Sequence, residues 1–423
     1  MFVLLGLFVV ISSSQQLSAD FVYGQGGSFT TATANKGSVS AASLFGPQQI
    51  TVTPVNDLYV ADSGNNRVLA YLYRNSTAFK VYGQSGSFTN VGSGTTADTL
   101  RAPRGVAVSS TGDVYIADSS NNRVLYYTIT STTASRVYGQ QGNFTAAVAN
   151  NGGASAMSLR APFAVTTDAS GNLYICDSGN NRVLYYDNGS TTAARVYGQP
   201  DFTTVSTAGA SNGIPPTANY LNGPFGVTVT PAGVYIADTF YNRVMFYSGT
   251  STTVSRVYGQ GGSYTSSAAN NGGVSASSLS YPTSVAVNSA GNVYITDALN
   301  NRVLFYVGTS TTASAVFGQA DFTSDAVQTT SATSLTSPQG VFLDTNGHLY
   351  VSQPSEYRIT TFDVSSTIPP TAPPITNNVC FHIDTTITYK VTRCRHPNAV
   401  SPMCSLRMGW RFATAAPPVR RFH

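Results

Sequence analysis

The chain has 423 residues, and only 9% of them are charged. Because ordinary globular proteins are about 25% charged, Ser, Thr, Asn, Gly and Tyr must form most of this surface. Up to residue 365 the chain has 15 basic and 17 acidic residues, so the net charge of +4 comes from the C-terminal segment. Affinity for nucleic acid depends largely on basic side chains that neutralise phosphates. This charge distribution therefore disfavours nucleic acid as a partner.

Residues 1–11 form an apolar run interrupted only by Gly6, and small and polar residues follow as far as Ala19. The run is too short to span a bilayer and is typical of the hydrophobic region of a secretory signal peptide. We predict a signal peptide over residues 1–19, with cleavage after Leu17-Ser18-Ala19, and no transmembrane segment. Three glycosylation sequons agree with a secreted, extracellular protein, and they begin at Asn75, Asn143 and Asn188.

Six copies of one pattern organise residues 20–365. The first copy, residues 58–69, reads Leu-Tyr-Val-Ala-Asp, a short polar turn and then Asn-Arg-Val-Leu. The other copies are residues 114–125, 173–184, 234–245, 293–304 and, in diverged form, 349–360. Each copy lies between a strand signal that opens with proline and one that ends in Val-Tyr-Gly-Gln. Four short strands per repeat, with turn pairs such as Gly-Asn between them, predict an all-β fold of six propeller blades.

The ends of the repeated region predict how the ring closes. The sixth repeat stops near Asp363 without a Val-Tyr-Gly-Gln segment, whereas a spare copy of that segment occupies residues 21–25. We expect the N-terminal copy to be the outer strand of the last blade, which leaves no long unpaired strand edge.

The segments Pro-x-Gly-Val-Ala-Val, Gly-Asn-Leu-Tyr and Asn-Arg-Val resemble the NHL repeat, over roughly residues 20–365. This resemblance implies a six-bladed β-propeller. It implies no single activity, because NHL propellers serve as protein-binding, RNA-binding and enzymatic modules. Function must therefore be argued from the residues of a site.

Connectors of 18 to 24 residues join each Val-Tyr-Gly-Gln segment to the proline of the next blade. Each connector has an aromatic residue near its start and a leucine three residues before that proline. We expect these two residues to pin the connector to its blade, because loops of this length need anchors to stay ordered. Propeller connectivity gathers the connectors on one face, together with the turns between second and third strands. This connector face is the expected binding surface.

Aspartates and arginines recur at the polar turn of the repeat. An aspartate at the start of a turn accepts backbone N–H groups, and an arginine five residues later can bridge to that carboxylate or to a neighbouring blade. Because they recur from blade to blade, we assign them a structural role. They are Asp62, Arg67, Asp118, Arg123, Asp177, Arg182, Asp238, Arg243, Asp297, Arg302 and Arg358.

Ligand-binding residues, in contrast, should differ between blades. The residue after the blade-opening proline should ring the mouth of the central channel, and in three successive blades it is Arg104, Phe163 and Phe225. Tyr241 lies in the polar turn of the fourth blade. An arginine beside aromatic rings is typical of interface centres, so these four residues form a candidate ligand-binding patch. The alternative is that they pack against the overlying connectors.

The sequence indicates no catalytic residue, no metal site and no cofactor. Only His348 of the four histidines lies in the repeated region, so the several histidines that bind zinc in NHL-like amidating lyases have no counterpart. Most aspartates are assigned to turns, which leaves few carboxylates for calcium or for acid–base chemistry. Cys176 replaces an alanine of other blades and is expected to be a small buried residue.

Residues 366–379 are rich in proline and predict a stiff linker. The following segment, residues 380–423, is a basic tail with three of the four cysteines. Its first eight residues, which begin at Cys380, resemble the start of a Hint autoprocessing module, in which that cysteine would attack the preceding peptide bond. Too few residues follow for such a domain, so we expect a poorly ordered tail with an odd number of thiols.

These observations favour a secreted or cell-surface propeller that recognises an extracellular protein or glycan through its connector face. A second hypothesis is a metal-assisted lyase or hydrolase that acts in the channel. A third is a structural spacer that presents the tail. The sequence indicates no oligomeric state.

Overall fold

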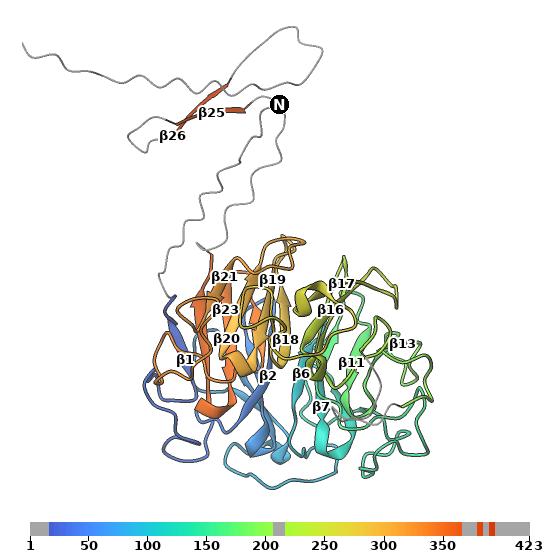
Figure 1. The fold of residues 1–423 in the computed structure, drawn as a ribbon. Helices are drawn as coiled ribbons and strands as arrows, with labels where there is room; N and C mark the ends of the chain where they lie inside the picture. Colours follow the sequence, from blue (N-terminus) through green and yellow to red (C-terminus); the bar gives the residue numbers. More distant parts are fainter. Residues whose placement is uncertain (1–16, 206–215, 366–378, 384–388, 394–423) are drawn as a thin grey trace, which may run out of the picture. The chain divides into compact units, whose positions relative to one another are not determined.

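The structure is a computed structural model that describes residues 17–205, 216–365, 379–383 and 389–393. The chain divides into two compact units, Met1–Thr367 and Ile368–His423. The described part of the first unit contains six four-stranded antiparallel sheets (Figure 1). In the second unit, β25 (Val379–Ile383) pairs antiparallel with β26 (Tyr389–Arg393).

The hairpin β25–β26 was not expected from the sequence, which predicted a poorly ordered tail. It includes the first residues of the Hint-like segment. The rest of the tail lies outside the described residues, as do the linker up to residue 378 and residues 1–16 of the predicted signal peptide.

The six sheets are the six predicted blades. The first contains β2 (Pro47–Val52), β3 (Leu58–Asp62), β4 (Arg67–Tyr71) and β5 (Lys80–Tyr82). The second contains β6 (Gly105–Val108), β7 (Val114–Asp118), β8 (Arg123–Tyr127) and β9 (Arg136–Tyr138). The third contains β10 (Val165–Thr167), β11 (Leu173–Asp177), β12 (Arg182–Tyr186) and β13 (Arg195–Tyr197). The fourth contains β14 (Pro224–Thr230), β15 (Gly233–Asp238), β16 (Arg243–Ser248) and β17 (Val254–Tyr258).

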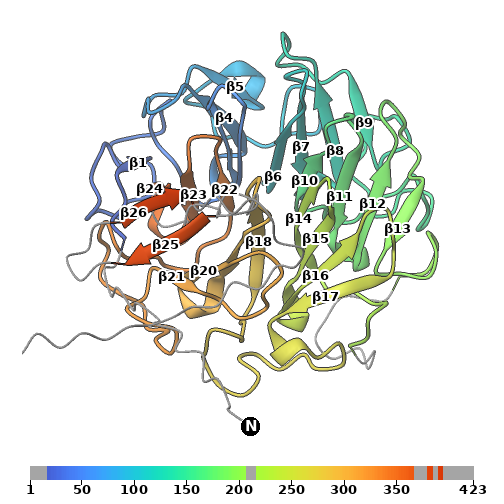
Figure 2. The same ribbon diagram turned by 90° about the horizontal axis from the view of Figure 1, so that it is seen from above.

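The fifth blade contains β18 (Pro282–Val287), β19 (Val293–Asp297), β20 (Arg302–Tyr306) and β21 (Ala315–Phe317). The sixth contains β22 (Val341–Leu343), β23 (His348–Gln353), β24 (Arg358–Asp363) and the N-terminal strand β1 (Phe21–Tyr23). Figure 2 shows the sheets arranged around a common centre, with the first strand of each blade innermost.

A one-turn 3-10 helix joins the second and third strands of every blade. These helices are η1 (Ser63–Asn65), η3 (Ser119–Asn121), η4 (Ser178–Asn180), η5 (Thr239–Tyr241), η7 (Ala298–Asn300) and η8 (Pro354–Glu356). Two more, η2 (Gln84–Gly86) and η6 (Gln260–Gly262), open connectors. In the described part of the chain, no helix has the length and apolar character needed to cross a membrane.

The N-terminal strand closes the last blade, as predicted, because β1 pairs antiparallel with β24. The contact begins before the strand. Ala19 is buried, and its N–H donates to the carbonyl of Ala332 at 2.7 Å. The same bond joins the residue two positions before the outer strand to the preceding connector in four other blades, as Ala78–Ala41, Ala134–Ala97, Ala193–Ala156 and Ala313–Ala276. Ala19 thus makes a contact of the sixth blade, and cleavage after it stays a prediction.

The apolar core lies between neighbouring blades. The tyrosine of Val-Tyr-Gly-Gln packs edge-on against the last tyrosine of the third strand in the next blade, with ring centroids 5.1–5.4 Å apart. The five pairs are Tyr23–Tyr71, Tyr82–Tyr127, Tyr138–Tyr186, Tyr197–Tyr247 and Tyr258–Tyr306. Between the fifth and sixth blades Phe317 and Phe362 take these places. Edge-to-face pairs add stability beyond the apolar area that they bury.

The connector leucines are buried, as predicted, and the glycine of Val-Tyr-Gly-Gln allows them to approach the blade. Gly139 has φ +92°, and a Cβ there would lie only 2.8 Å from the Leu159 side chain. A residue with a side chain would therefore be strained in its backbone and would displace the leucine.

Candidate functional site

A buried ion pair occupies the turn between the second and third strands of the first five blades. The arginine Nε donates to the aspartate Oδ2 at 2.7 Å, and both side chains are fully buried. The aspartate Oδ1 accepts the backbone N–H of the residue after the connector leucine at 2.6–2.7 Å. Burial raises the pKa of each of these carboxyls, and the arginine and the other donors act in the opposite direction.

The rest of each guanidinium ties two connectors to the blade. Arg67 donates through Nη1 to the carbonyl of Phe88 in the following connector. Through Nη2 it donates to the carbonyls of Ser40 and Ser43 in the preceding connector, at 3.0 and 2.8 Å. In all six blades the carbonyl of the connector aromatic accepts this bond, at Phe88, Phe144, Phe202, Tyr264, Phe322 and Phe29. This is the geometry that a structural role requires.

The sixth blade makes these contacts with different residues. Gln353 replaces the aspartate, and its Oε1 accepts the Thr336 N–H and one Arg358 Nη2–H, each at 3.2 Å. The negative charge comes from Glu356, which forms an ion pair with Arg358 and is the only glutamate in the chain. The negative charge therefore lies three residues later in the turn than in the other five blades, and Arg358 remains buried.

The asparagine before each arginine is a structural residue that the sequence analysis did not single out. Asn66 adopts a left-handed conformation, with φ +53°. Its Oδ1 accepts the Ala102 N–H at 2.8 Å, and its Nδ2 donates to the Val91 carbonyl at 2.9 Å, so it joins the following connector to its blade. Asn122, Asn181, Asn242 and Asn301 accept the equivalent N–H. Their recurrence in five of the six repeats was the available signal.

A cavity of about 230 Å³ opens at the inner ends of the blades, and we call it the channel mouth. Its lining residues are Gln48, Arg104, Phe163, Phe225, Tyr281, Ser337, Gln339, Pro354 and Ser355. Three of the predicted ligand-binding residues therefore lie together. The rings of Phe163 and Phe225 stack with centroids 4.1 Å apart and planes 8° apart. The Arg104 guanidinium lies 4.8 Å from the centroid of the Phe163 ring.

Tyr241, the fourth predicted residue, does not line the mouth. It takes the place of Asn65 in the first blade, which packs against the buried ion pair. Tyr241 is buried accordingly, with its ring 5.1 Å from the Arg243 guanidinium. Its neighbour Phe240 instead contacts Phe225, with ring centroids 5.4 Å apart. Successive residues of the 3-10 turn point in different directions, so Tyr241 does not lie with the other three predicted residues.

Tyr281 belongs to the mouth and was missed. Its ring lies 5.7 Å from that of Phe225 and 5.6 Å from that of Phe240. The residue before the blade-opening proline has positive φ in every blade, and the other five are the small residues Gly46, Ala102, Ala161, Gly223 and Ser337. A tyrosine at φ +59° is strained by about 1–3 kcal/mol, so the blade itself does not explain its presence. In the sequence, the signal was a tyrosine at a position where the other five blades have glycine, alanine or serine.

Among the described residues, Arg104 is the only charged one that lines the mouth. Its side chain is exposed, and no donor or acceptor of the described residues pairs with its guanidinium. Desolvation by the surrounding rings lowers the pKa of Arg104, although an arginine stays charged at neutral pH. Burial raises the pKa of the Tyr281 phenol, which is therefore neutral.

The channel below the mouth has a wall without charge. A second cavity of about 310 Å³ there is lined by inner-strand residues that are apolar, hydroxyl-bearing or, at Gln49, an amide. Within the described ranges, no three residues of the types His, Cys, Asp and Glu are grouped so that they could hold a metal ion. His348, the first residue of β23, contacts Asp344 of the preceding turn at 3.1 Å. Cys176 is fully buried, as predicted, and burial raises the pKa of its thiol.

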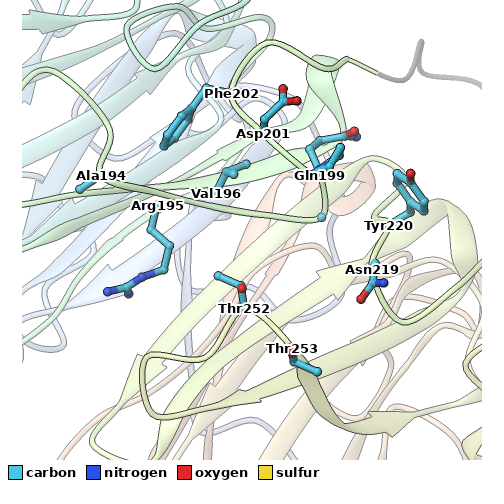
Figure 3. Close-up of a pocket in the computed structure, with 12 residues that line it drawn as sticks. Ala194, Arg195, Val196, Gln199, Asp201, Phe202, Asn219, Tyr220, Thr252 and Thr253 are labelled. Carbon is cyan, nitrogen blue, oxygen red and sulfur yellow. The ribbon is translucent and has the colours of Figure 1, made fainter.

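A third cavity, of about 580 Å³, lies between the outer parts of the third and fourth blades (Figure 3). Here β17 begins at Val254, which pairs with Tyr247 of its own blade, where other blades have the alanine that bonds to the connector. Arg195 and Asp201 both line this groove, but their side chains point away from one another (Figure 3). The Arg195 guanidinium contacts the Tyr197 hydroxyl and the Tyr185 ring, and Asp201 accepts bonds from Thr203 and Thr204.

The family model of the NHL repeat matches residues 100–127 and 279–305, which lie in the second and fifth blades. The distance in sequence between the two matches agrees with the repeat period of the blades. The protein is a six-bladed β-propeller that contains NHL repeats. No curated protein matches the chain.

Solved structures similar to this NHL propeller share little sequence with it. A protein of unknown function from Bacteroides thetaiotaomicron is 16% identical over 81% of this chain and 75% of its own, with a TM-score of 0.50. Virginiamycin B lyase from Staphylococcus aureus is 13% identical over 75% of this chain and 95% of its own, with a TM-score of 0.43. A chain of a nidogen–laminin complex is 17% identical over 65% of this chain and 81% of its own, with a TM-score of 0.43. At such identities the likeness concerns the fold alone.

Proposed function

We propose that this NHL propeller is a secreted or cell-surface recognition module that binds an extracellular protein or glycan at the channel mouth. The observation that carries the proposal is the exposed, unpaired Arg104 guanidinium beside the stacked rings of Phe163 and Phe225. A cation held against aromatic rings, with its N–H groups free, is suited to contact a partner.

The pattern of variation between blades supports this assignment. The ion pairs and connector bonds recur around the ring, as contacts that build the fold must. The aromatic and cationic residues of the mouth occur in some blades only, and Tyr281 is held there in a strained backbone conformation. Unfavourable conformations are retained mainly where a site needs them.

Two features support an extracellular location. The asparagines of the three sequons, Asn75, Asn143 and Asn188, are all exposed, as acceptors of glycans must be. The weakly charged surface, rich in Ser, Thr and Asn, agrees with a role outside the cell. The apolar N-terminal run is the feature from which secretion is proposed. No specific observation favours the lyase or the spacer.

The test is to probe the secreted full chain against glycan and extracellular-protein arrays, with the variant Arg104→Gln/Tyr281→Gly beside it. Arg160→Gln is the matched control, since Arg160 is an exposed arginine of a connector that does not line the mouth. The proposal predicts a ligand that the double variant loses and the control retains, while thermal melting shows that both variants are folded. Retention by the double variant would refute the site, and no ligand on any array would refute the function.

A further inference from the structure

The channel mouth has two chemically different halves. The second to fifth blades contribute Arg104, Phe163, Phe225 and Tyr281, whereas the first and sixth blades contribute neutral polar groups, chiefly Gln48, Ser337, Gln339 and Ser355. A ligand that fills such a cavity must be apolar on one side and rich in hydrogen-bonding groups on the other.

The polar half has free hydrogen-bonding capacity. Among the described residues, nothing pairs with the side-chain amide of Gln339 or with the hydroxyls of Ser337 and Ser355. The Gln48 amide makes one long bond, 3.5 Å to the Gly46 carbonyl. The hydroxyls of Ser40 and Ser43, in contrast, bond to their own loop: Ser40 accepts the Ala42 N–H, and Ser43 donates to the Ser40 carbonyl. The free groups of the mouth are thus open to a ligand.

The aromatic half places ring surface next to a cation. Phe225 and Tyr281 are only half-buried, so parts of their rings face the cavity. Arg104 is free to offer a pair of N–H groups, because its other contact is with the face of the Phe163 ring. The guanidinium fork matches a carboxylate in a bidentate geometry. No carboxylate of the described ranges lines the mouth, and Glu356, which follows Ser355 in the chain, is already paired with Arg358.

We infer that the channel mouth binds a carboxylated sugar residue, such as a hexuronic acid, of a glycan. Arg104 pairs with the sugar carboxylate. The rings of Phe225 and Tyr281 cover the C–H face of the pyranose, and the amides and hydroxyls of the polar half bond to its hydroxyl groups. The volume of about 230 Å³ suits one such residue. This inference rests on the proposed recognition function and names the chemistry of its ligand.

A peptide with a free C-terminal carboxylate is the other ligand that Arg104 would accept. A peptide end would leave most of the neutral groups in the polar half without partners, whereas a pyranose presents hydroxyl groups around its ring. Unpaired polar groups covered by a ligand reduce its affinity. The observed lining therefore favours the sugar.

The experiment is calorimetric titration of the secreted full chain with methyl glucuronide and with methyl glucoside, which lacks only the carboxylate. We expect the glucuronide to bind at least about tenfold more tightly than the glucoside. In Arg104→Gln the glucuronide affinity should fall about tenfold to hundredfold, with less loss in Arg104→Lys, which keeps the charge but not the fork. Arg160→Gln should bind as the unmodified chain does. Melting temperatures confirm that each variant is folded.

Several results would overturn the inference. Equal affinity for the two glycosides, or glucuronide binding that is retained in Arg104→Gln, would show that Arg104 does not pair with the sugar carboxylate. Tighter binding of an N-acetylated dipeptide with a free carboxylate would replace the sugar by a peptide end and leave the recognition function standing. Failure of all three probes, with an array ligand that is still lost in Arg104→Gln/Tyr281→Gly, would overturn the inference and leave the recognition function standing. Silence in both experiments would overturn the recognition function as well.

Discussion

The buried turns and the channel mouth use the same kinds of side chain for different purposes. In the turns, arginine is fully buried, and its Nε, Nη1 and Nη2 atoms donate to a carboxylate or to connector carbonyls, as those of Arg67 do. At the mouth, Arg104 is exposed and its N–H groups have no partner in the described chain. The arginines that recur in every blade are hydrogen-bonded within the protein and stabilise the ring. Arg104 does not recur, and its N–H groups remain available to a ligand.

The sixth blade shows that different residues can make the structural contacts of the ring. Gln353 and Glu356 replace the aspartate of the sixth blade, yet the guanidinium of Arg358 remains buried and bonded. A buried arginine needs a negative charge and several acceptors, but not at one fixed position. The residues of the mouth do not have to neutralise a buried arginine, so they can differ between blades.

Removal of the closing strand should have the largest effect. Deletion of residues 1–23 exposes the edge of β24 and loses the burial of Val22 and Tyr23, which is worth roughly 3–6 kcal/mol. The free energy of unfolding, measured by denaturant titration, should fall by at least that amount. A change of less than about 1 kcal/mol would show that the ring does not depend on this strand.

Loss of one buried carboxylate should be nearly as damaging. In Asp118→Ala the Arg123 charge stays buried without its partner, and such losses cost about 3–5 kcal/mol. The control is Asp325→Ala, since Asp325 is exposed and its change should be within about 0.5 kcal/mol. Equal melting temperatures for the two variants would contradict a structural role of the ion pairs.

The sixth blade allows a test by rescue. Glu356→Asn should destabilise the fold by about 3 kcal/mol, because Arg358 loses its negative partner. Addition of Gln353→Asp recreates the arrangement of the other blades and should recover most of the loss. If the double variant unfolds as readily as the single one, the two arrangements are not equivalent.

The smallest effect concerns the residue two positions before the closing strand. A chain that begins at Asp20 lacks the Ala19–Ala332 hydrogen bond and should be about 1 kcal/mol less stable than one that begins at Leu17. Mass spectrometry of the secreted protein will show which N-terminus occurs. If the two chains melt at the same temperature, the bond at Ala19 is dispensable.

The number of blades and the closure of the ring followed from the sequence because both depend on repetition. Asp62 and its equivalents recur, and the spare segment at residues 21–25 could fill only one gap. Arg104, Phe163 and Phe225 could be placed at the mouth because one position after a proline has the same location in every blade.

The rest of the mouth depends on the direction of single side chains in irregular loops. Whether Phe240 or Tyr241 contacts Phe225 is decided by the geometry of a 3-10 turn, which periodicity does not describe. Tyr281 lies in a left-handed position that only its small counterparts in other blades reveal. The outer groove between the third and fourth blades results from a change in strand pairing at Val254, and spacing alone does not predict it.

The most direct test of the division between structural turns and a binding mouth is one set of melting temperatures. The unmodified chain, Arg104→Gln and Asp118→Ala are each melted with and without saturating methyl glucuronide, since a ligand of the folded state stabilises it. We expect glucuronide to raise the melting temperature of the unmodified chain but not that of Arg104→Gln, and only Asp118→Ala to melt lower without ligand. An equal rise in the unmodified chain and Arg104→Gln, or a loss of stability in Arg104→Gln as large as in Asp118→Ala, would contradict this division.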